Sequence, residues 1–363
     1  MARGKRPKRF GKLDLTRRHV LAGGAAVVLV PTYWKQASAQ EKRIFIRDPG
    51  GPYAPGFKEA FYDPFKEATG IEAVGLQGQH EPTSLIKGMV DTQTYTWDMA
   101  HLSLAACVQL RDEGYLQPLN VKSPYLDSTP AEYKNDYFAG CNVFAVVLAY
   151  RTDAFEDKGK QPPQSWADFF DTEKFPGRRA MRKHPFDTIE QALLADGVPL
   201  DKLYPLDFDR AYKKLDTIKS KIDVWWTGGA QTSQLLKSGE VDICPAWNAR
   251  VQTAIDDGAP VKIVWNQHLW SPEGWTILKG TPKADMCREF IKFATDPARQ
   301  AVFTKHLAYG PTHPDAYKWI PEDRARILPT HPDYIKSRIQ SDFQFWAEHK
   351  DAAAERFNAW VIS

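Results

Sequence analysis

The sequence predicts an α/β fold that is divided between two domains. Strand and helix patterns alternate along most of the chain, which is typical of mainly parallel sheets flanked by helices. The apolar run NVFAVVLAY at 142–150 has the composition of a strand that is buried on both faces. A chain of 363 residues also exceeds what one compact core usually holds. Because no low-complexity linker divides it, we expect extended strands to connect the domains.

The first elements are expected before the 142–150 strand. The patterns predict strands over 43–47, 71–76 and 97–102, and helices over 56–70, 82–90 and 104–114. The first of these helices restarts at Asp63-Pro64, because proline suits the first turn of a helix. It ends at Gly70, and the third ends at Gly114, because glycine suits the residue that follows a helix.

A second α/β block follows the 142–150 strand. The patterns predict strands over 178–183, 223–226, 241–247 and 261–265, and helices over 187–197, 207–218, 230–240 and 249–258. In the 207–218 segment the apolar residues recur at helical spacing, at Phe208, Ala211, Tyr212, Leu215 and Ile218. This segment is therefore expected to bury one face.

Residues 1–39 have the features of an export signal. A basic leader with adjacent Arg17 and Arg18 precedes an apolar stretch from Val20 to Val30 and the small-residue end ASAQ. This order predicts a twin-arginine signal peptide that is cleaved after Ala39. The apolar stretch is too short to anchor the protein, since a membrane-spanning helix needs ~20 residues. We therefore expect the mature protein in the periplasm.

The signal changes what the net charge implies. It carries nine Lys/Arg and one Asp, so its removal shifts the net charge from +3 to −5. An acidic mature chain gives no support to nucleic-acid binding, and it is compatible with a cationic ligand.

Four cysteines remain in an oxidising compartment, at positions 107, 141, 244 and 287. Their spacing does not match a zinc site. We expect a disulfide between Cys107 and Cys141. The alternative is that all four are small buried hydrophobic residues.

The sequence lacks the common catalytic and phosphate-binding motifs, namely G-x-S-x-G, H-E-x-x-H, the P-loop and G-x-G-x-x-G. No histidine pair has metal-ligand spacing. We therefore expect no catalytic residue, metal or cofactor. Tryptophans instead gather near the ends of predicted strands, where open α/β sheets bind ligands: Trp225, Trp226, Trp247, Trp265, Trp270 and Trp275. Aromatic faces at such places hold aliphatic chains and ammonium groups.

Several longer segments carry a family resemblance. They include AYRTDAF, PQSWADFFDTEKFPGRRAMRK, LYPLDFDRAYKKLD, VWWTGGAQTSQLLKSGEVDICPAWNARVQTAIDDGAPVKIVW, GWTILKGTP and AYGPTHPDA. In their order and spacing, over nearly all of residues 41–363, the chain resembles periplasmic solute-binding proteins of ABC importers, in particular the spermidine/putrescine-binding branch.

The resemblance implies a two-lobed type II periplasmic binding protein, in which each lobe is a mainly parallel sheet flanked by helices and the chain crosses at a hinge. Lobe 1 is expected to comprise 40–149 plus 271–318, and lobe 2 to comprise 150–270 plus 319–363. Such a protein closes around a small solute and presents it to an inner-membrane ABC permease. We expect a monomer that binds no nucleic acid.

The resemblance also implies a set of ligand-binding residues. Asp187 stands where the family has an acid before a helix, although it also suits the N-cap of that helix. The tryptophan-asparagine pair at the end of a strand is matched by Trp247 and Asn248, with Asn248 also expected to cap the next helix. The remaining positions carried over from the family are Trp270, Glu273 and Tyr309.

The residues themselves add further candidates. Gly51 and Tyr53 follow the first strand, and Trp226 ends another strand. Trp225 and Trp226 should point in opposite directions, so at most one faces the ligand. Gly228 and Gly229 should expose backbone N–H groups at the start of a helix.

Three positions depart from the polyamine-binding pattern. His184 replaces an expected acid, and Ala105 and Ala106 replace aromatic residues.

Arg250 lies in the first turn of a helix, where a cation opposes the helix dipole, and this placement favours an anionic partner. The partner is either a neighbouring carboxylate or the carboxylate of a ligand.

The main hypothesis is an importer component for a small amine-bearing solute, a polyamine such as putrescine or spermidine. The alternative is an amino acid or amino-carboxylate such as γ-aminobutyrate, with Arg250 binding its carboxylate. A secreted enzyme on the same scaffold is the less favoured rival.

Overall fold

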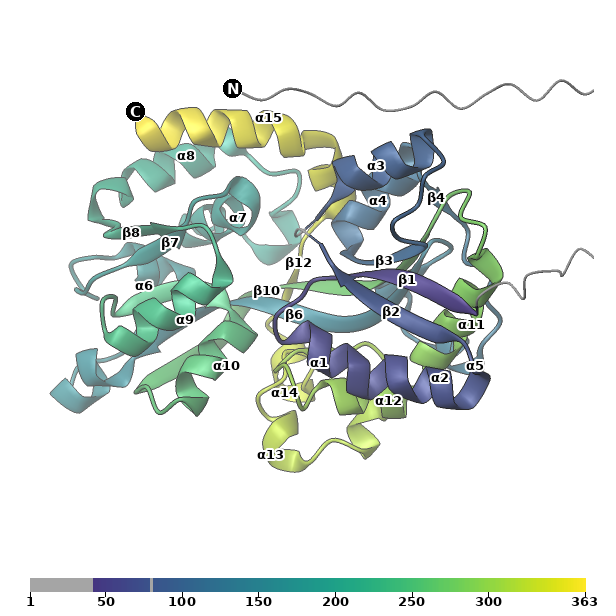
Figure 1. Cartoon of the computed structure of the whole chain (residues 1–363). Coiled ribbons are helices and arrows are strands. Elements are labelled where there is room, and N and C mark those ends of the chain that lie inside the picture. Colours follow the sequence, from purple (N-terminus) through teal and green to yellow (C-terminus); the bar gives the residue numbers. More distant parts are fainter. Residues whose placement is uncertain (1–41, 79–80) are drawn as a thin grey trace, which may run out of the picture. The chain divides into compact units, whose positions relative to one another are not determined.

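The computed structural model describes residues 42–78 and 81–363 (Figure 1). The predicted signal peptide, its twin-arginine pair and its cleavage site lie outside the described residues. All described residues belong to one compact unit, Lys42–Ser363.

A mixed sheet runs through this unit, with the strand order β11-β6-β10-β3-β1-β2. β1 (Arg43–Asp48) pairs in parallel with β2 (Glu72–Gln77) and β3 (Met99–Ser103). β10 (Val261–Leu278) runs antiparallel to β3 and to β6 (Phe138–Arg151). The sheet is therefore mixed, where the sequence predicted mainly parallel sheets, because the chain returns along β10 against its own outward course in β6.

The short strands complete this arrangement. β9 (Ile243–Trp247) pairs antiparallel with β6, and β12 (Ile339–Gln340) pairs in parallel with β10. Further short strands of the same sheet are β4 (Leu116–Gln117), β5 (Lys134–Asn135) and β11 (Gly310–Pro311). β7 (Ala180–Arg182) and β8 (Val224–Trp226) form a separate parallel pair.

The helices of the first half surround β1, β2 and β3. α1 continues through a π-helical turn at Lys58–Tyr62 into α2, which ends at Gly70 with φ +71°. Their bounds are α1 (Tyr53–Phe57), α2 (Asp63–Thr69), α3 (Thr83–Asp91), α4 (Leu104–Asp112) and α5 (Pro124–Ser128). The helical pattern that restarts at Asp63-Pro64 and the glycine stop at Gly70 are thus confirmed.

The later helices follow the predicted alternation as far as α10. Their bounds are α6 (Trp166–Phe170), α7 (Pro185–Ala195), α8 (Phe208–Asp216), α9 (Gly229–Ser238), α10 (Asn248–Asp256), α11 (Ala284–Ala294), α12 (Pro297–Phe303), α13 (Glu322–Ala325), α14 (Pro332–Ile335) and α15 (Phe343–Ile362). Single 3₁₀ turns lie at Ala131–Tyr133, Thr152–Ala154, Glu156–Lys158, Leu200–Lys202, Lys219–Lys221 and Pro314–Lys318. The predicted apolar face of α8 is confirmed, since Ala211, Tyr212 and Leu215 are buried.

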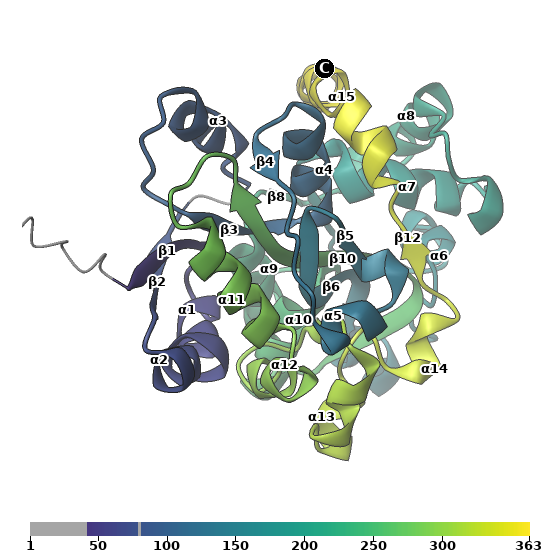
Figure 2. The ribbon, with the colours of Figure 1, turned by 90° about the vertical axis from the view of Figure 1, so that its right-hand side faces the viewer.

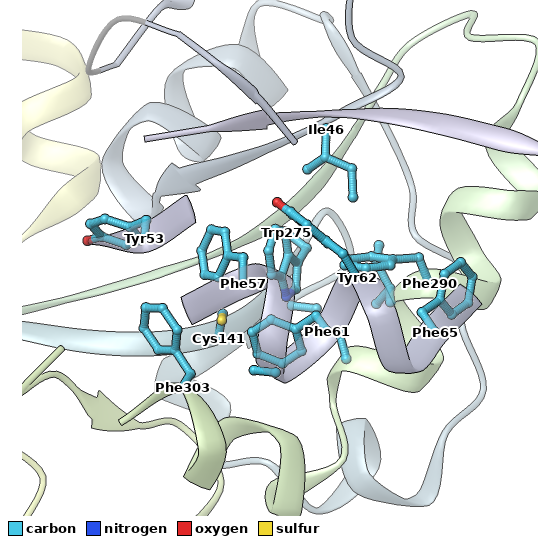
Figure 3. Packing of buried hydrophobic residues seen from close by; sticks show 14 of the residues in the cluster. Ile46, Tyr53, Phe57, Phe61, Tyr62, Phe65, Cys141, Trp275, Phe290 and Phe303 are labelled. Carbon is cyan, nitrogen blue, oxygen red and sulfur yellow. The ribbon is translucent and has the colours of Figure 1, made fainter. Parts of the chain in front are cut away.

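Two large apolar clusters stabilise the unit. One packs α1, α2, α11 and α12 around Phe57, Phe61 and Trp275, which lie close together in Figure 3. The other packs α6, α7, α8 and α15 against β6, around Trp166 and Leu215. Each fully buried side chain of this size contributes about 1.5–3 kcal/mol of hydrophobic free energy.

The four cysteines are all buried and free. The predicted Cys107–Cys141 disulfide is therefore wrong. Cys107 packs in the cluster around α4, whereas Cys141 packs in the cluster around Phe57 and Trp275. Burial raises the pKa of the Cys107 thiol, which keeps it in the protonated form.

The described part of the chain lacks two further kinds of feature. From Lys42 to Ser363, leaving aside 79–80, no helix combines the length and apolar character needed to cross a membrane. Within the same residues, no group of three or more His, Cys, Asp or Glu side chains is placed to hold a metal ion.

Candidate ligand-binding site

A cavity of about 560 Å³ lies where the carboxyl ends of several strands meet. Ser103 ends β3, Arg182 ends β7 and Trp247 ends β9, and all three line the cavity. The sequence places α4, α7 and α10 directly after these strands or a short turn later. The cavity therefore occupies the place at which open α/β sheets bind ligands.

One wall of the cavity is acidic and centres on Glu273 of β10. The exposed fraction of Glu273 is 7%. Its Oε2 accepts hydrogen bonds from the Tyr53 hydroxyl at 2.5 Å and from Asn142 Nδ2 at 2.8 Å. In Figure 3, Tyr53 stands at the edge of the aromatic cluster with its hydroxyl directed away from Phe57. These bonds fix the carboxylate in one orientation at the cavity surface.

A second layer of buried polar groups supports this carboxylate. Asn142 Oδ1 lies 3.0 Å from His101 Nε2, and His101 is fully buried. Burial, with the nearby charge of Arg47, holds the pKa of His101 well below its usual value, so the ring is neutral. Burial and the charge of Glu273 raise the pKa of Tyr53 well above 10, so its hydroxyl stays a donor.

Glu81 adds a second carboxylate to the cavity lining. Its Oε2 accepts from Ser103 Oγ at 3.0 Å, and its Oε1 accepts from Ser103 N at 3.3 Å. Arg47 lines the same wall and lies close enough to act on both carboxylates, so its charge offsets part of theirs and the wall stays acidic by one charge. Such a wall is suited to an ammonium group that loses water on binding.

A second wall of the cavity is cationic and centres on Arg250, in the first turn of α10. Its Nε is buried and has no hydrogen-bond partner within 42–78 and 81–363. Across the same residues, Arg250 forms no ion pair. A half-buried guanidinium in this state is a strong binding site for a carboxylate, which it contacts with two parallel N–H donors.

Arg182 adds a second guanidinium to the same wall. Its Nη1 donates to Asp187 Oδ2 at 2.5 Å, and its Cζ lies 5.3 Å from the centre of the Trp247 ring. The ion pair and the indole face hold Arg182 in place at the cavity. Asp187 therefore neutralises an arginine of the protein.

The start of α9 lies against the same tryptophan. Gly228 and Gly229 line the cavity, and Gly228 is the N-cap of α9. A Cβ on Gly229 would lie 2.4 Å from Trp247 Cε3, so only glycine fits there. The positive end of the α9 dipole is thereby brought beside the two arginines.

Of the ten predicted site residues, five line this cavity: Tyr53, Trp247, Arg250, Glu273 and Tyr309. Tyr309 packs beside Tyr53, with their ring centroids 6.0 Å apart. His184, Ala105 and Ala106, which depart from the polyamine-binding pattern, line it as well. The sequence differences at these positions are therefore differences in the cavity wall.

The other five predicted residues lie elsewhere. Asp187 is buried in its ion pair with Arg182, has a positive φ of 73° and does not cap α7, since His184 is the N-cap. Asn248 does not cap α10 either, because its side chain bonds to Ala145 N and Ala308 O. It ties β6 to the segment after α12.

Trp270, Trp226 and Gly51 do not line the cavity, and the geometry of their segments explains why. Trp270 and Glu273 are three residues apart on β10, so they point to opposite faces. Trp270 packs on Tyr133 instead, at 5.4 Å between ring centroids. Trp226 is fully buried behind Trp247, and Gly51 is exposed beyond the cavity rim.

Sequence reasoning missed several lining residues. Arg182 and Ser103 end β7 and β3, each one residue away from the end of a predicted strand, so the strand-end rule that selected Trp247 points to them as well. Glu81 precedes a predicted helix and carries no such signal. Trp346, Ala347 and Lys350 come from α15, a helix that was not predicted.

A family model for bacterial extracellular solute-binding proteins matches residues 60–328. The chain belongs to this family. Its members are the solute-binding, non-enzymatic components of ABC importers and act in the periplasm or outside the cell. For this solute-binding protein a small-molecule ligand follows from the family, and so does an ABC permease as partner.

Individual relatives narrow the comparison. The γ-aminobutyric acid-binding protein of Pseudomonas aeruginosa is 34% identical over 334 residues, which cover 90% of this chain and 92% of the relative. The spermidine/putrescine-binding periplasmic protein 1 of Haemophilus influenzae is more distant, at 21% identity over 298 residues, 78% of this chain and 81% of the relative. The solute-binding protein is thus more similar to a γ-aminobutyrate binder than to this polyamine binder.

Solved structures give the same picture for the fold. An ABC transporter substrate-binding protein from Bradyrhizobium japonicum has a TM-score of 0.83 at 37% identity, over 88% of this chain and 99% of that one. A GABA receptor has a TM-score of 0.80 at 34% identity, over 88% and 97%. The α/β fold with its mixed sheet thus matches periplasmic binding proteins, and these neighbours imply the two-lobed type II arrangement.

Proposed function

We propose that this protein binds a zwitterionic ω-amino carboxylate, such as γ-aminobutyrate, and presents it to its permease. The observation that carries the proposal is Arg250, a half-buried guanidinium at the cavity whose Nε has no hydrogen-bond partner in the described residues. Burying such a donor is unfavourable unless a partner arrives. A ligand carboxylate supplies that partner.

The two walls suggest how the ligand is oriented. Its carboxylate binds Arg250, beside Arg182 and the N-terminus of α9. Its ammonium binds Glu273, with Glu81 on the same wall. The methylene chain between them packs on the Trp247 ring.

A polyamine, the main hypothesis from the sequence, is supported less well than this alternative. A diamine carries ammonium groups at both ends, and one of them would face Arg182 and Arg250. Like charges that are desolvated together are strongly unfavourable. Asp187, the acid that the resemblance assigns to one ammonium, is already paired with Arg182.

We further propose that binding closes two lobes about a hinge, with lobe 1 at 40–149 plus 271–318 and lobe 2 at 150–270 plus 319–363. Two of the three proposed crossings, at 149–150 and 270–271, would fall within the long antiparallel pair of β6 and β10, and the third, at 318–319, would lie outside it. We also propose that the chain is exported by the twin-arginine route with cleavage after Ala39, and that it acts as a monomer.

Calorimetric titration of the mature protein tests the ligand class. The panel contains γ-aminobutyrate, putrescine, spermidine, butyrate and a neutral sugar. We expect γ-aminobutyrate to bind with a Kd of about 1 μM or below, near −8 kcal/mol. Butyrate lacks the ammonium group and putrescine lacks the carboxylate, so both should bind far more weakly. Tighter binding of putrescine than of γ-aminobutyrate would contradict the proposal.

A larger amino-carboxylate is a second candidate, and the size of the cavity favours it. A ligand of about seven non-hydrogen atoms needs roughly 200 Å³ if each atom takes the volume of a water molecule. The cavity holds about 560 Å³. Native mass spectrometry of protein purified without added ligand distinguishes the two, because the mass of a retained ligand reports its size.

A further inference from the structure

The C-terminal helix α15 supplies part of the cavity wall. Phe343, Trp346, Ala347 and Lys350 recur at i, i+3, i+4 and i+7, so they form one stripe along the helix. The last three of them line the cavity. Figure 1 and Figure 2 both show α15 beside α8, with its first turns near α4.

Trp346 is held in one orientation by a buried carboxylate. Its Nε1 donates to Glu190 Oε1 at 2.6 Å, and the same oxygen accepts from the Tyr204 hydroxyl at 2.6 Å. Glu190 lies on α7 and is fully buried. The Phe186 ring packs on the indole with 5.0 Å between centroids. The exposed fraction of Trp346 is only 2%, so the part at the cavity is a small, fixed face.

The helix α15 is anchored to α7 and α8 on one side and to α4 on the other. Toward α8, Arg356 pairs with Asp209 at 2.6 Å and Trp360 Nε1 donates to Asp216 at 2.7 Å. Toward α4, Phe343 and Ala347 pack in the cluster around Leu110. The indole is thus fixed to the wall that carries Arg182 and Arg250.

From this geometry we infer that Trp346 determines ligand size in the cavity and that Glu190 is the residue that positions it. The inference rests on the proposed function only in that an amino-carboxylate occupies the cavity. The indole face and Ala347 act as an end wall, which excludes chains or substituents longer than the space beside Trp247. The two charged walls select the ends of the ligand, and α15 selects its bulk.

The test is a ligand series titrated by calorimetry against the wild type and four variants. The series is γ-aminobutyrate, 5-aminopentanoate and 6-aminohexanoate, which differ only in the number of methylenes. For Trp346→Ala we expect γ-aminobutyrate to bind roughly 10-fold more weakly and the preference to shift toward the longer chains by roughly 10-fold or more. Ala347→Leu should shift the preference the other way, because it adds volume at the same wall.

Glu190 is tested by a pair of near-isosteric variants. Glu190→Gln keeps an oxygen acceptor for the indole N–H and should retain the wild-type order of preference. Glu190→Leu removes the acceptor and should shift the order in the direction of Trp346→Ala. Thermal unfolding of every variant shows whether it is folded, and Ala347→Leu gives an answer even if Trp346→Ala does not fold.

The outcomes separate this inference from the proposed function. If the wild type binds no member of the series, the proposed function fails and the inference with it. If the wild type binds the series and neither Ala347→Leu nor Trp346→Ala changes the order of preference, the inference alone is overturned. A shift with both Glu190 variants alike would leave Trp346 as the determinant and remove the role given to Glu190.

Discussion

The two charged walls of the cavity differ in whether their charged side chains already have partners within the protein. On the acidic wall, Glu273 accepts hydrogen bonds from Tyr53 and Asn142, which are themselves held by buried groups. On the cationic wall, Arg182 is neutralised by Asp187, whereas Arg250 has no carboxylate partner within the described residues. The acidic wall is thus preorganised by its own hydrogen bonds. In the proposed function the ligand carboxylate completes the cationic wall, so the two walls should respond differently to substitution.

The largest expected effect is at Arg250. Arg250→Ala should weaken γ-aminobutyrate binding by about 3 kcal/mol or more, because the ligand carboxylate is then desolvated without a partner. Calorimetry measures this directly. Arg326→Ala is the matched control. Arg326 is the exposed C-cap residue of α13 and pairs with Glu322 of the same helix. Unchanged γ-aminobutyrate affinity in Arg250→Ala would show that the ligand carboxylate does not depend on the cationic wall.

Removing the negative charge of the acidic wall should cost less. Glu273→Gln keeps the volume and one oxygen acceptor, and we expect binding to weaken by about 2 kcal/mol, the range for a hydrogen bond to a charged group. Glu322→Gln, at an exposed carboxylate, serves as control. If Glu273→Gln proved more damaging than Arg250→Ala, the acidic wall would be the dominant one.

A third carboxylate, Glu190, differs from Glu273 and Glu81 because it is buried behind the cationic wall and does not line the cavity. Burial, then the charge of Asp187, raises the pKa of Glu190 from 4.5 to about 7. Its raised pKa gives stability that is present below pH 4.5 and is lost as the pH rises through about 7. Relative to the wild type, Glu190→Gln should therefore gain about 2 kcal/mol of unfolding free energy between pH 5 and pH 8.

Urea unfolding at the two pH values measures this gain. The difference between variant and wild type isolates Glu190 from other shifted groups, such as His101 and His268. A difference that does not change with pH would show that Glu190 is ionised throughout.

The smallest expected effect concerns the backbone beside Trp247. Gly229→Ala places a methyl group 2.4 Å from Trp247 Cε3. It should displace the indole and weaken binding by about 1 kcal/mol, at the low end of overpacking effects. Gly88→Ala, in α3 and away from the cavity, is the control, because a Cβ there meets nothing within 4 Å. Equal effects of the two variants on calorimetric affinity would show that Trp247 is not the cause.

Much of the secondary structure was predictable because local patterns are strong. The buried face of α8 follows from five apolar residues at helical spacing, and Gly70 ends α2 with the positive φ that glycine permits. The length of β10 was not predictable. Only 261–265 has a continuous strand pattern, whereas the strand extends to Leu278 by pairing with β6 and β3. Hydrogen bonds to distant strands decide such a length.

Site residues divide in the same way. Trp247 and Arg250 were predictable because a strand end and a first helical turn are local features. Trp270 was predicted to face the ligand, but it lies on the other face of β10 and packs on Tyr133. Asp187 was assigned to the ligand, but it pairs with Arg182. A single sequence does not show which partner a charged residue takes.

By itself, the sequence determined the alternating elements, the family resemblance and one arginine at the start of a helix that calls for an anion. Packing of distant segments brings Arg182 and Glu273 to the same cavity as Arg250 and adds residues of α15 to its lining. The physical reason is separation along the chain. Trp346 and Glu190 are 156 residues apart, and only the packing of α15 on α7 brings the indole N–H to the carboxylate.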